Sequence, residues 1–173
     1  MRTGVSKRGS RVFAAASAGA VALVLMTVGA VVAGGPAPAN DMRANASRLQ
    51  LMNYSVRGHN INATTELGEE LPCGSIESTV WYQIYVPSGA GLEINTYGSD
   101  YDTVLAVYKN PRSAPIVCND DTDDPYYSDI PEFWYDSEVV VPGTPRTGQW
   151  YYIQVGGYSG DEGHIVLNYR LVR

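Results

Sequence analysis

Between residues 80 and 171 the sequence repeats one pattern, in which short runs of alternating residues are separated by Gly, Pro, Asn and Ser. A two-residue period turns one face of a β-strand toward a core and the other toward solvent. The clearest case places Ile165, Leu167 and Tyr169 on one face. Seven such runs predict a single antiparallel β-sandwich of the jelly-roll type, with about seven to nine strands: 80–86, 92–97, 101–108, 116–119, 137–141, 150–155 and 165–171.

Helical spacing is confined to one short segment. Met42, Ala46, Leu49 and Met52 are spaced as they would be on one face of a short helix, and no helical period follows residue 53. The chain is 45% apolar and 17% charged, a composition that can bury a core and lies far from that of disordered chains.

The first 39 residues have the three parts of a secretory signal peptide. Basic residues at Lys7, Arg8 and Arg11 precede an apolar stretch at 12–33, and Ala37-Pro38-Ala39 has the small-x-small pattern of a cleavage site. The chain is therefore expected to be secreted, with the sandwich domain at 40–173 and no membrane attachment after cleavage. The alternative is an uncleaved N-terminal anchor, because the apolar stretch is long enough to span a bilayer.

Charge and cysteine content exclude several classes of protein. The chain has 12 Lys and Arg against 18 Asp and Glu, a net charge of −6, which is unsuited to binding nucleic acid. Two cysteines are too few for a Cys-rich zinc module. In an oxidising compartment, Cys73 and Cys118 are expected to form a disulfide.

The order of several motifs resembles the bacterial pre-peptidase C-terminal domain, a secreted β-sandwich appended to exported proteases. Its most specific part is the block at 98–108, followed by Asn119-Asp120-Asp121. The resemblance implies a non-catalytic accessory module. By analogy with collagenase members of that family, it also implies that Asn40 and Asp41 are calcium ligands. The segments that carry the resemblance are 40–46, 62–69, 78–82, 96–108, 118–121 and 150–158.

Acidic residues are concentrated around two expected strands. Asp100 and Asp102 open the strand at 101–108, and three further aspartates follow Asp120 and Asp121 within ten positions. Calcium prefers six to eight such hard oxygen ligands, whereas the spacing does not form an EF-hand loop. Calcium is therefore the candidate cofactor, and it competes with the interpretation that these carboxylates are solvated turn residues and no cofactor is bound. The candidate ligands are Asn40, Asp41, Asp100, Asp102, Asn119, Asp120 and Asp121.

Aromatic residues provide a second candidate site. The chain has 13 Tyr and three Trp, and exposed rings can stack on a sugar or an extended peptide. Trp81, Tyr82 and Tyr152 are expected in the core. The partner would be an extracellular protein or polysaccharide, bound by the side chains in and just beyond a Pro-rich segment: Tyr126, Tyr127, Trp134 and Tyr135.

Enzymatic function is the competing interpretation. No nucleophile elbow, zinc-protease motif or phosphate loop occurs, and His59 and His164 have no catalytic context. The sequence favours a non-catalytic binding module. The alternatives are a hydrolase inhibitor, a structural cell-surface domain and a small glycoside hydrolase. For the last, a carboxylate pair would have to come from Glu66, Glu69, Glu70 and Glu77.

Overall fold

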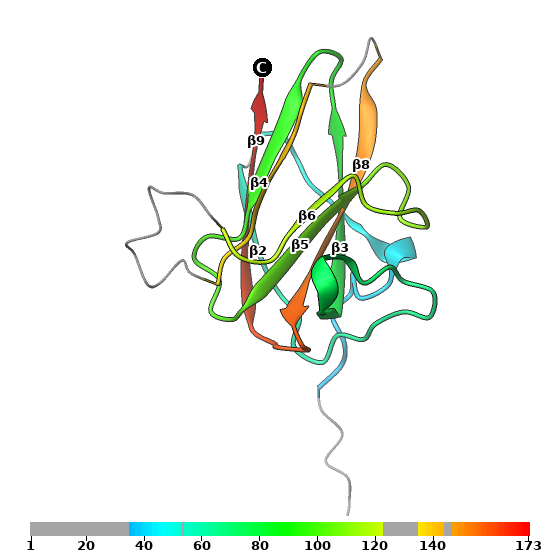
Figure 1. The fold of residues 1–173 in the computed structure, drawn as a ribbon, viewed down its shortest axis with the longest axis vertical. Coiled ribbons are helices and arrows are strands. Elements are labelled where there is room, and N and C mark those ends of the chain that lie inside the picture. Colours follow the sequence, from blue (N-terminus) through cyan, green and yellow to red (C-terminus); the bar gives the residue numbers. More distant parts are fainter. Residues whose placement is uncertain (1–34, 53, 123–134, 144–146) are drawn as a thin grey trace, which may run out of the picture. The chain divides into compact units, whose positions relative to one another are not determined.

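The computed structural model describes residues 35–52, 54–122, 135–143 and 147–173. Within them, nine strands form a five-stranded sheet of order β1-β3-β8-β5-β6 and a four-stranded sheet of order β2-β9-β4-β7 (Figure 1). The strands are β1 (Ser47–Arg48), β2 (Ser55–His59), β3 (Ile76–Val86), β4 (Gly91–Asn95), β5 (Thr103–Tyr108), β6 (Val117–Asn119), β7 (Glu138–Val141), β8 (Gln149–Tyr158) and β9 (His164–Val172).

The two sheets confirm the expected β-sandwich. All neighbouring strands pair antiparallel except β1 and β3, which are parallel. Inward-facing residues of both sheets, such as Ile84, Leu92 and Leu167, are fully buried in the main core. This core follows directly from the alternation in the sequence, because every second side chain of a strand faces the opposite sheet.

The segment at 42–52 differs from the expected helix. It contains only a three-residue 3-10 turn at Arg43–Asn45, and the chain then extends as β1. Ala46 and Leu49 are buried, but Met52 at the end of the expected stripe is 86% exposed. The Leu49 N–H donates to the carbonyl of Gln83, so pairing with the edge of β3 replaces helical hydrogen bonds.

A second, smaller core lies on the outer face of the five-stranded sheet. Trp81 and Tyr108 are fully buried there, with ring centroids 5.4 Å apart, and Tyr152 is half-buried against them. The N-terminal segment covers this face: the Trp81 N–H donates to the Asn40 carbonyl, and the Asn40 amide donates back to the Trp81 carbonyl. Strand β5 is consequently buried on both faces, although its sequence alternation predicted one solvent-facing side.

The expected disulfide between Cys73 and Cys118 is confirmed, with the two Cα atoms 6.1 Å apart. It joins the 3-10 turn η2 (Pro72–Gly74) to the edge strand β6. Such bonds are typical of exported proteins. No helix in the described part of the chain is both long and apolar enough to cross a membrane. The expected signal peptide, like the alternative anchor, falls almost wholly on residues outside the described ranges.

Candidate metal centre

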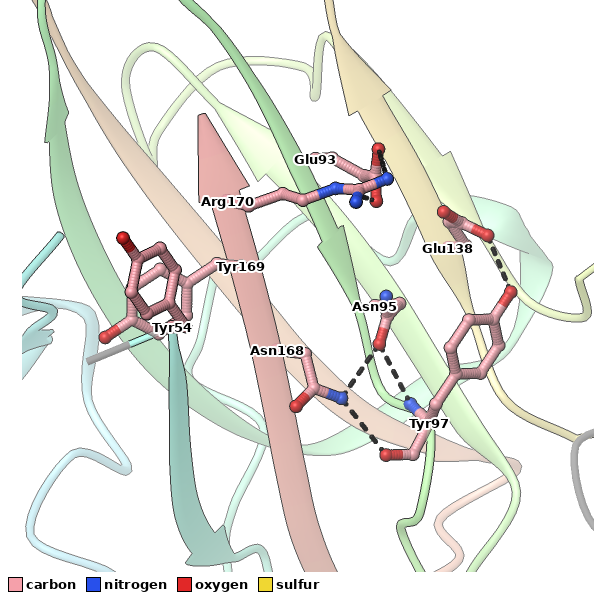
Figure 2. A pocket seen from close by; sticks show the side chains of 8 residues that line it. All are labelled: Tyr54, Glu93, Asn95, Tyr97, Glu138, Asn168, Tyr169 and Arg170. Carbon is pink, nitrogen blue, oxygen red and sulfur yellow. Dashed lines mark hydrogen bonds and ion pairs between the residues drawn. The ribbon is translucent and has the colours of Figure 1, made fainter. Parts of the chain in front are cut away.

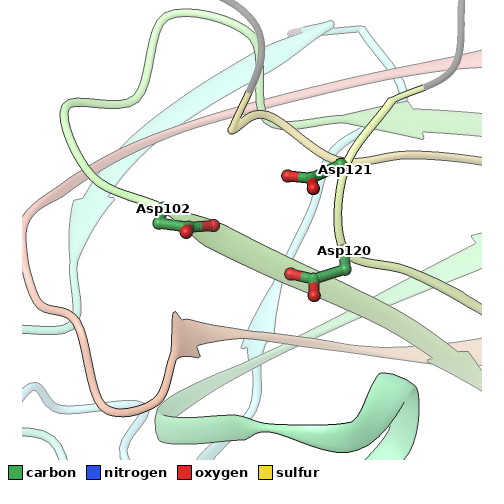
Figure 3. A group of neighbouring side chains, drawn as sticks. All are labelled: Asp102, Asp120 and Asp121. Atoms are coloured by element: carbon green, nitrogen blue, oxygen red, sulfur yellow. The ribbon is translucent and has the colours of Figure 1, made fainter.

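Three of the candidate ligands meet at one end of the sandwich. Asp102 immediately precedes β5, and Asp120 and Asp121 immediately follow β6, which pairs with β5. One carboxylate oxygen from each lies within 4.8 Å of the others. Figure 3 shows the three side chains turned toward a common space. The antiparallel pairing explains this grouping, because the residue before one strand lies beside the residues that follow its partner.

Hydrogen bonds fix the backbone that carries Asp120 and Asp121. The Asn119 side chain donates to the Asp121 carbonyl over 2.8 Å and accepts from the Glu138 N–H over 2.9 Å. The Ser137 hydroxyl, which reaches across from the start of β7, contacts the Asp120 carbonyl at 2.5 Å. Both sheets therefore contribute to holding the acidic turn in place.

Two oxygens of the carboxylate cluster lack hydrogen-bond partners among the described residues. Asp102 Oδ1 and Asp120 Oδ1 are buried oxygens with no hydrogen bond among the described residues. Burial and the neighbouring Asp120, Asp121 and Asp161 raise the pKa of Asp102 from 3.8 to about 6. Burial, together with Asp121, also raises the pKa of Asp120. Buried oxygens that accept no hydrogen bond are costly unless a proton or a cation compensates them.

A hollow of about 690 Å³ lies beside this cluster and adds further carboxylates. Asp136 is only 2% exposed, and burial raises its pKa to about 6. Weak hydrogen bonds from the Gly98 N–H and the Thr96 hydroxyl lower the pKa and offset only part of this effect. Sequence reasoning missed Asp136, because its proximity depends on packing between the two sheets. The hollow is lined by Ser99, Asp100, Tyr101, Asp102, Tyr135, Asp136 and Asp161.

The donor set fits calcium. It consists of carboxylate oxygens, with no cysteine or histidine in the group, and hard oxygen ligands suit Ca²⁺ or Mg²⁺ rather than zinc or copper. Three clustered carboxylates with two buried, unpartnered oxygens would be compensated by a divalent cation. Water and backbone carbonyls would have to supply the remaining ligands, as is usual for calcium.

The other candidate ligands are engaged elsewhere. The Asp41 carboxylate accepts hydrogen bonds from the backbone N–H and the hydroxyl of Thr64, and the Asn40 amide binds Trp81. Asp100 accepts from the backbone N–H and the ring of His164, and these bonds lower its pKa. The structure therefore brings together Asp102, Asp120 and Asp121, with Asn119 supporting their turn.

Most of the aromatic candidates fall outside the described residues. This holds for Tyr126, Tyr127 and Trp134. Tyr135 is described and is 57% exposed, and it lines the acidic hollow. Its carbonyl accepts hydrogen bonds from the N–H and the hydroxyl of Thr103.

The carboxylates considered for catalysis serve other contacts or stand exposed. Glu69 accepts from the Trp81 indole, the Thr79 hydroxyl and the Glu66 N–H, and burial raises its pKa. Glu66 forms an ion pair with Arg43 over 2.9 Å. Glu70 and Glu77 are exposed, and of the two histidines His59 ends β2 and His164 begins β9, both at the surface.

Replacing Asp102 by Asn is expected to stabilise the metal-free protein at pH 7. The pKa of Asp102 is about 6 in the folded protein and ordinarily 3.8. At a pH above both values, the negative charge of this side chain therefore destabilises the folded state. For this partly exposed carboxyl, the gain is about 1 kcal/mol after allowance for solvent screening. Thermal unfolding of both proteins in EDTA should show a gain in melting temperature that shrinks as the pH falls toward 4. Glu70→Gln is the control, and a gain independent of pH would contradict the prediction.

Comparison with known proteins finds nine solved chains similar to this one, including the following two. One is the pre-peptidase C-terminal domain of collagenase from Bacillus anthracis, with 16% identity, a TM-score of 0.47, and coverage of 72% of this chain and 94% of that chain. The other is a periplasmic inhibitor of g-type lysozyme from Aeromonas hydrophila, with 14% identity, a TM-score of 0.43, and coverage of 73% and 96%. The first carries the domain name of the family that the sequence motifs resemble. No family model and no curated protein matches the chain.

Proposed function

We propose that this protein is an extracellular, non-catalytic binding module whose acidic end holds a calcium ion. The observation that carries the calcium proposal is the meeting of Asp102, Asp120 and Asp121 within 4.8 Å, with two buried oxygens that accept no hydrogen bond from the described residues. The partner would be an extracellular protein or polysaccharide.

Calcium would act on the position of the loops. Asp102 belongs to the start of β5, whereas Asp120 and Asp121 belong to the chain that leaves β6. Their mutual repulsion opposes the compact state, and a bound cation would convert that repulsion into attraction. A bound cation would therefore hold the start of β5 and the turn after β6 together more firmly than the hydrogen bonds of the metal-free protein do.

The assignment as a non-catalytic module is supported by the roles of the polar side chains. Glu66 and Glu69, two of the four glutamates considered for acid and base catalysis, stabilise the N-terminal segment and the second core instead. His164 pairs with Asp100 at the surface. The disulfide supports an extracellular location, since such bonds persist in oxidising compartments.

Thermal unfolding in EDTA and across a calcium series tests this function. At a calcium concentration 100-fold above the dissociation constant, a native-state site adds about 2.7 kcal/mol, which raises the melting temperature by roughly 8 °C. Magnesium should give a smaller rise. Asp120→Asn and Asp121→Asn should abolish most of the calcium effect, whereas the exposed Glu70→Gln should preserve it. An unchanged melting temperature at millimolar calcium would refute the calcium site.

A further inference from the structure

A polar groove crosses the outer face of the four-stranded sheet. It has a volume of about 320 Å³, at the lower end of the range for small-molecule sites, roughly 300–1,000 Å³. Glu93 and Asn95 project into it from β4, and Asn168 and Arg170 from β9 (Figure 2). These residues alternate with the buried Leu92, Ile94 and Leu167, so the strand period itself directs them outward.

The polar side chains of the groove are held in place by one another. Arg170 binds Glu93 through Nε–Oε1 at 2.7 Å and Nη2–Oε2 at 2.9 Å. Asn168 Nδ2 donates to Asn95 Oδ1 over 2.9 Å and to the Tyr97 carbonyl over 3.1 Å. Side chains ordered before a ligand arrives lose little conformational freedom on binding.

Several polar atoms remain available after these contacts. Asn95 Nδ2, Asn168 Oδ1 and Glu138 Oε1 make no hydrogen bond to a described residue, while Glu138 Oε2 accepts from the Tyr97 hydroxyl over 2.6 Å. An amide donor with acceptors around it matches vicinal hydroxyl groups, since each hydroxyl both donates and accepts. The sheet therefore presents a fixed array of partners for a polyol.

An exposed aromatic ring flanks the array. Tyr54 is 65% exposed and lines the groove, and its backbone has a φ of 58°, a left-handed conformation that is uncommon for tyrosine. The hydrogen bond from the Tyr169 N–H to the Tyr54 carbonyl, 2.9 Å long, secures this conformation. A tyrosine at the rim of a polar groove offers an apolar face on which the C–H side of a sugar ring can stack.

We propose that this groove binds a neutral polysaccharide, with Asn95, Asn168 and Glu138 contacting hydroxyl groups and Tyr54 stacking on a pyranose ring. This inference rests on the proposed function as a binding module and names its ligand class. The polar side chains that line the groove match the hydroxyl groups of a neutral sugar, which both donate and accept hydrogen bonds. Glu93 and Arg170 neutralise each other, so Glu138 leaves a negative charge that disfavours anionic polysaccharides.

Affinity electrophoresis tests this proposal with the purified protein and a panel of soluble polysaccharides: a β-1,3-glucan, hydroxyethylcellulose, a galactomannan, an arabinoxylan and a dextran. At least one should retard the protein, whereas polygalacturonate should not. Asn95→Ala and Tyr54→Ala should each weaken binding about two- to tenfold, the loss that follows from one hydrogen bond or one stacking contact. The matched controls Asn110→Ala and Tyr158→Ala, exposed residues outside the groove, should bind as the unchanged protein does.

The outcomes separate this inference from the metal-dependent function. Absence of retardation by every neutral polysaccharide, with the calcium-induced rise in melting temperature intact, overturns the groove and leaves the calcium site standing. Retardation that the controls weaken as much as the groove variants also overturns it. Thermal unfolding of Asn95→Ala monitors folding, and the variant Tyr54→Ala, at an exposed side chain, keeps the test decisive if Asn95→Ala is destabilised.

Discussion

Replacement of Trp81 by Ala is expected to lower the free energy of unfolding by about 3–5 kcal/mol, the range for truncating a large buried aromatic side chain. Trp81 is fully buried in the second core, where it packs against Tyr108. The change also deprives the Glu69 carboxylate of its indole donor, leaving a half-buried charge with fewer partners. Urea unfolding followed by circular dichroism measures the loss.

Trp150→Ala is the matched control for that experiment. Trp150 is 39% exposed and contacts Tyr85 edge to face at 5.5 Å, with the Arg48 guanidinium 5.1 Å from the ring. Its removal should cost clearly less than the removal of Trp81, because the Trp150 ring is already partly in contact with solvent and its loss leaves no enclosed cavity. Equal losses for the two tryptophans would contradict the assignment of a second core beneath the N-terminal segment.

Loss of the disulfide is expected to have a comparable effect. The free energy of unfolding of the double variant Cys73→Ser/Cys118→Ser should be about 4 kcal/mol lower than that of the unchanged protein. This value follows from the chain entropy of the loop, because 45 positions separate the two cysteines. The bond also anchors β6, and the acidic turn at Asp120 and Asp121 directly follows that strand. The variant should therefore show a smaller calcium-induced rise in melting temperature as well as a lower baseline.

Two measurements accompany the disulfide variant. Thiol labelling of the denatured, unreduced protein should find neither Cys73 nor Cys118 reactive. Reduction of the unchanged protein should reproduce the unfolding midpoint of the double variant, since both lack the same crosslink. Identical midpoints for the oxidised and reduced proteins would mean that packing alone holds η2 against β6.

The sandwich could be predicted because its strands carry strong local signals. The run at 165–171 alternates over its whole length and lies within β9. Strand β2 was missed, because Val56 is its only large apolar side chain and none of its residues is fully buried. The parallel pairing of β1 could not be predicted from the sequence either, because both of its residues are exposed. Hydrogen bonds of the neighbouring Ala46 and Leu49 to Gln83 hold β1 beside β3.

The candidate site was predictable only where ligands flank paired strands. Asp102 precedes one strand and Asp120 follows its neighbour, so local order brings them together. Asp136 could not be found in this way, because its burial results from contacts between the sheets. The groove likewise depends on register: Asn95 and Asn168 are opposite partners in the β4–β9 pair, although 73 positions separate them in the chain.

The lengths of the strands affect the tendency of this protein to aggregate at high concentration. In the described part of the chain, the interior strands β3, β8 and β9 span 11, 10 and 9 residues, whereas the sheet edges β1, β6, β7 and β2 have only two, three, four and five. Another chain can add a strand only at an edge, and short edges offer few unpaired backbone groups. Confining the longest ladders to sheet interiors therefore protects the molecule from edge-to-edge aggregation.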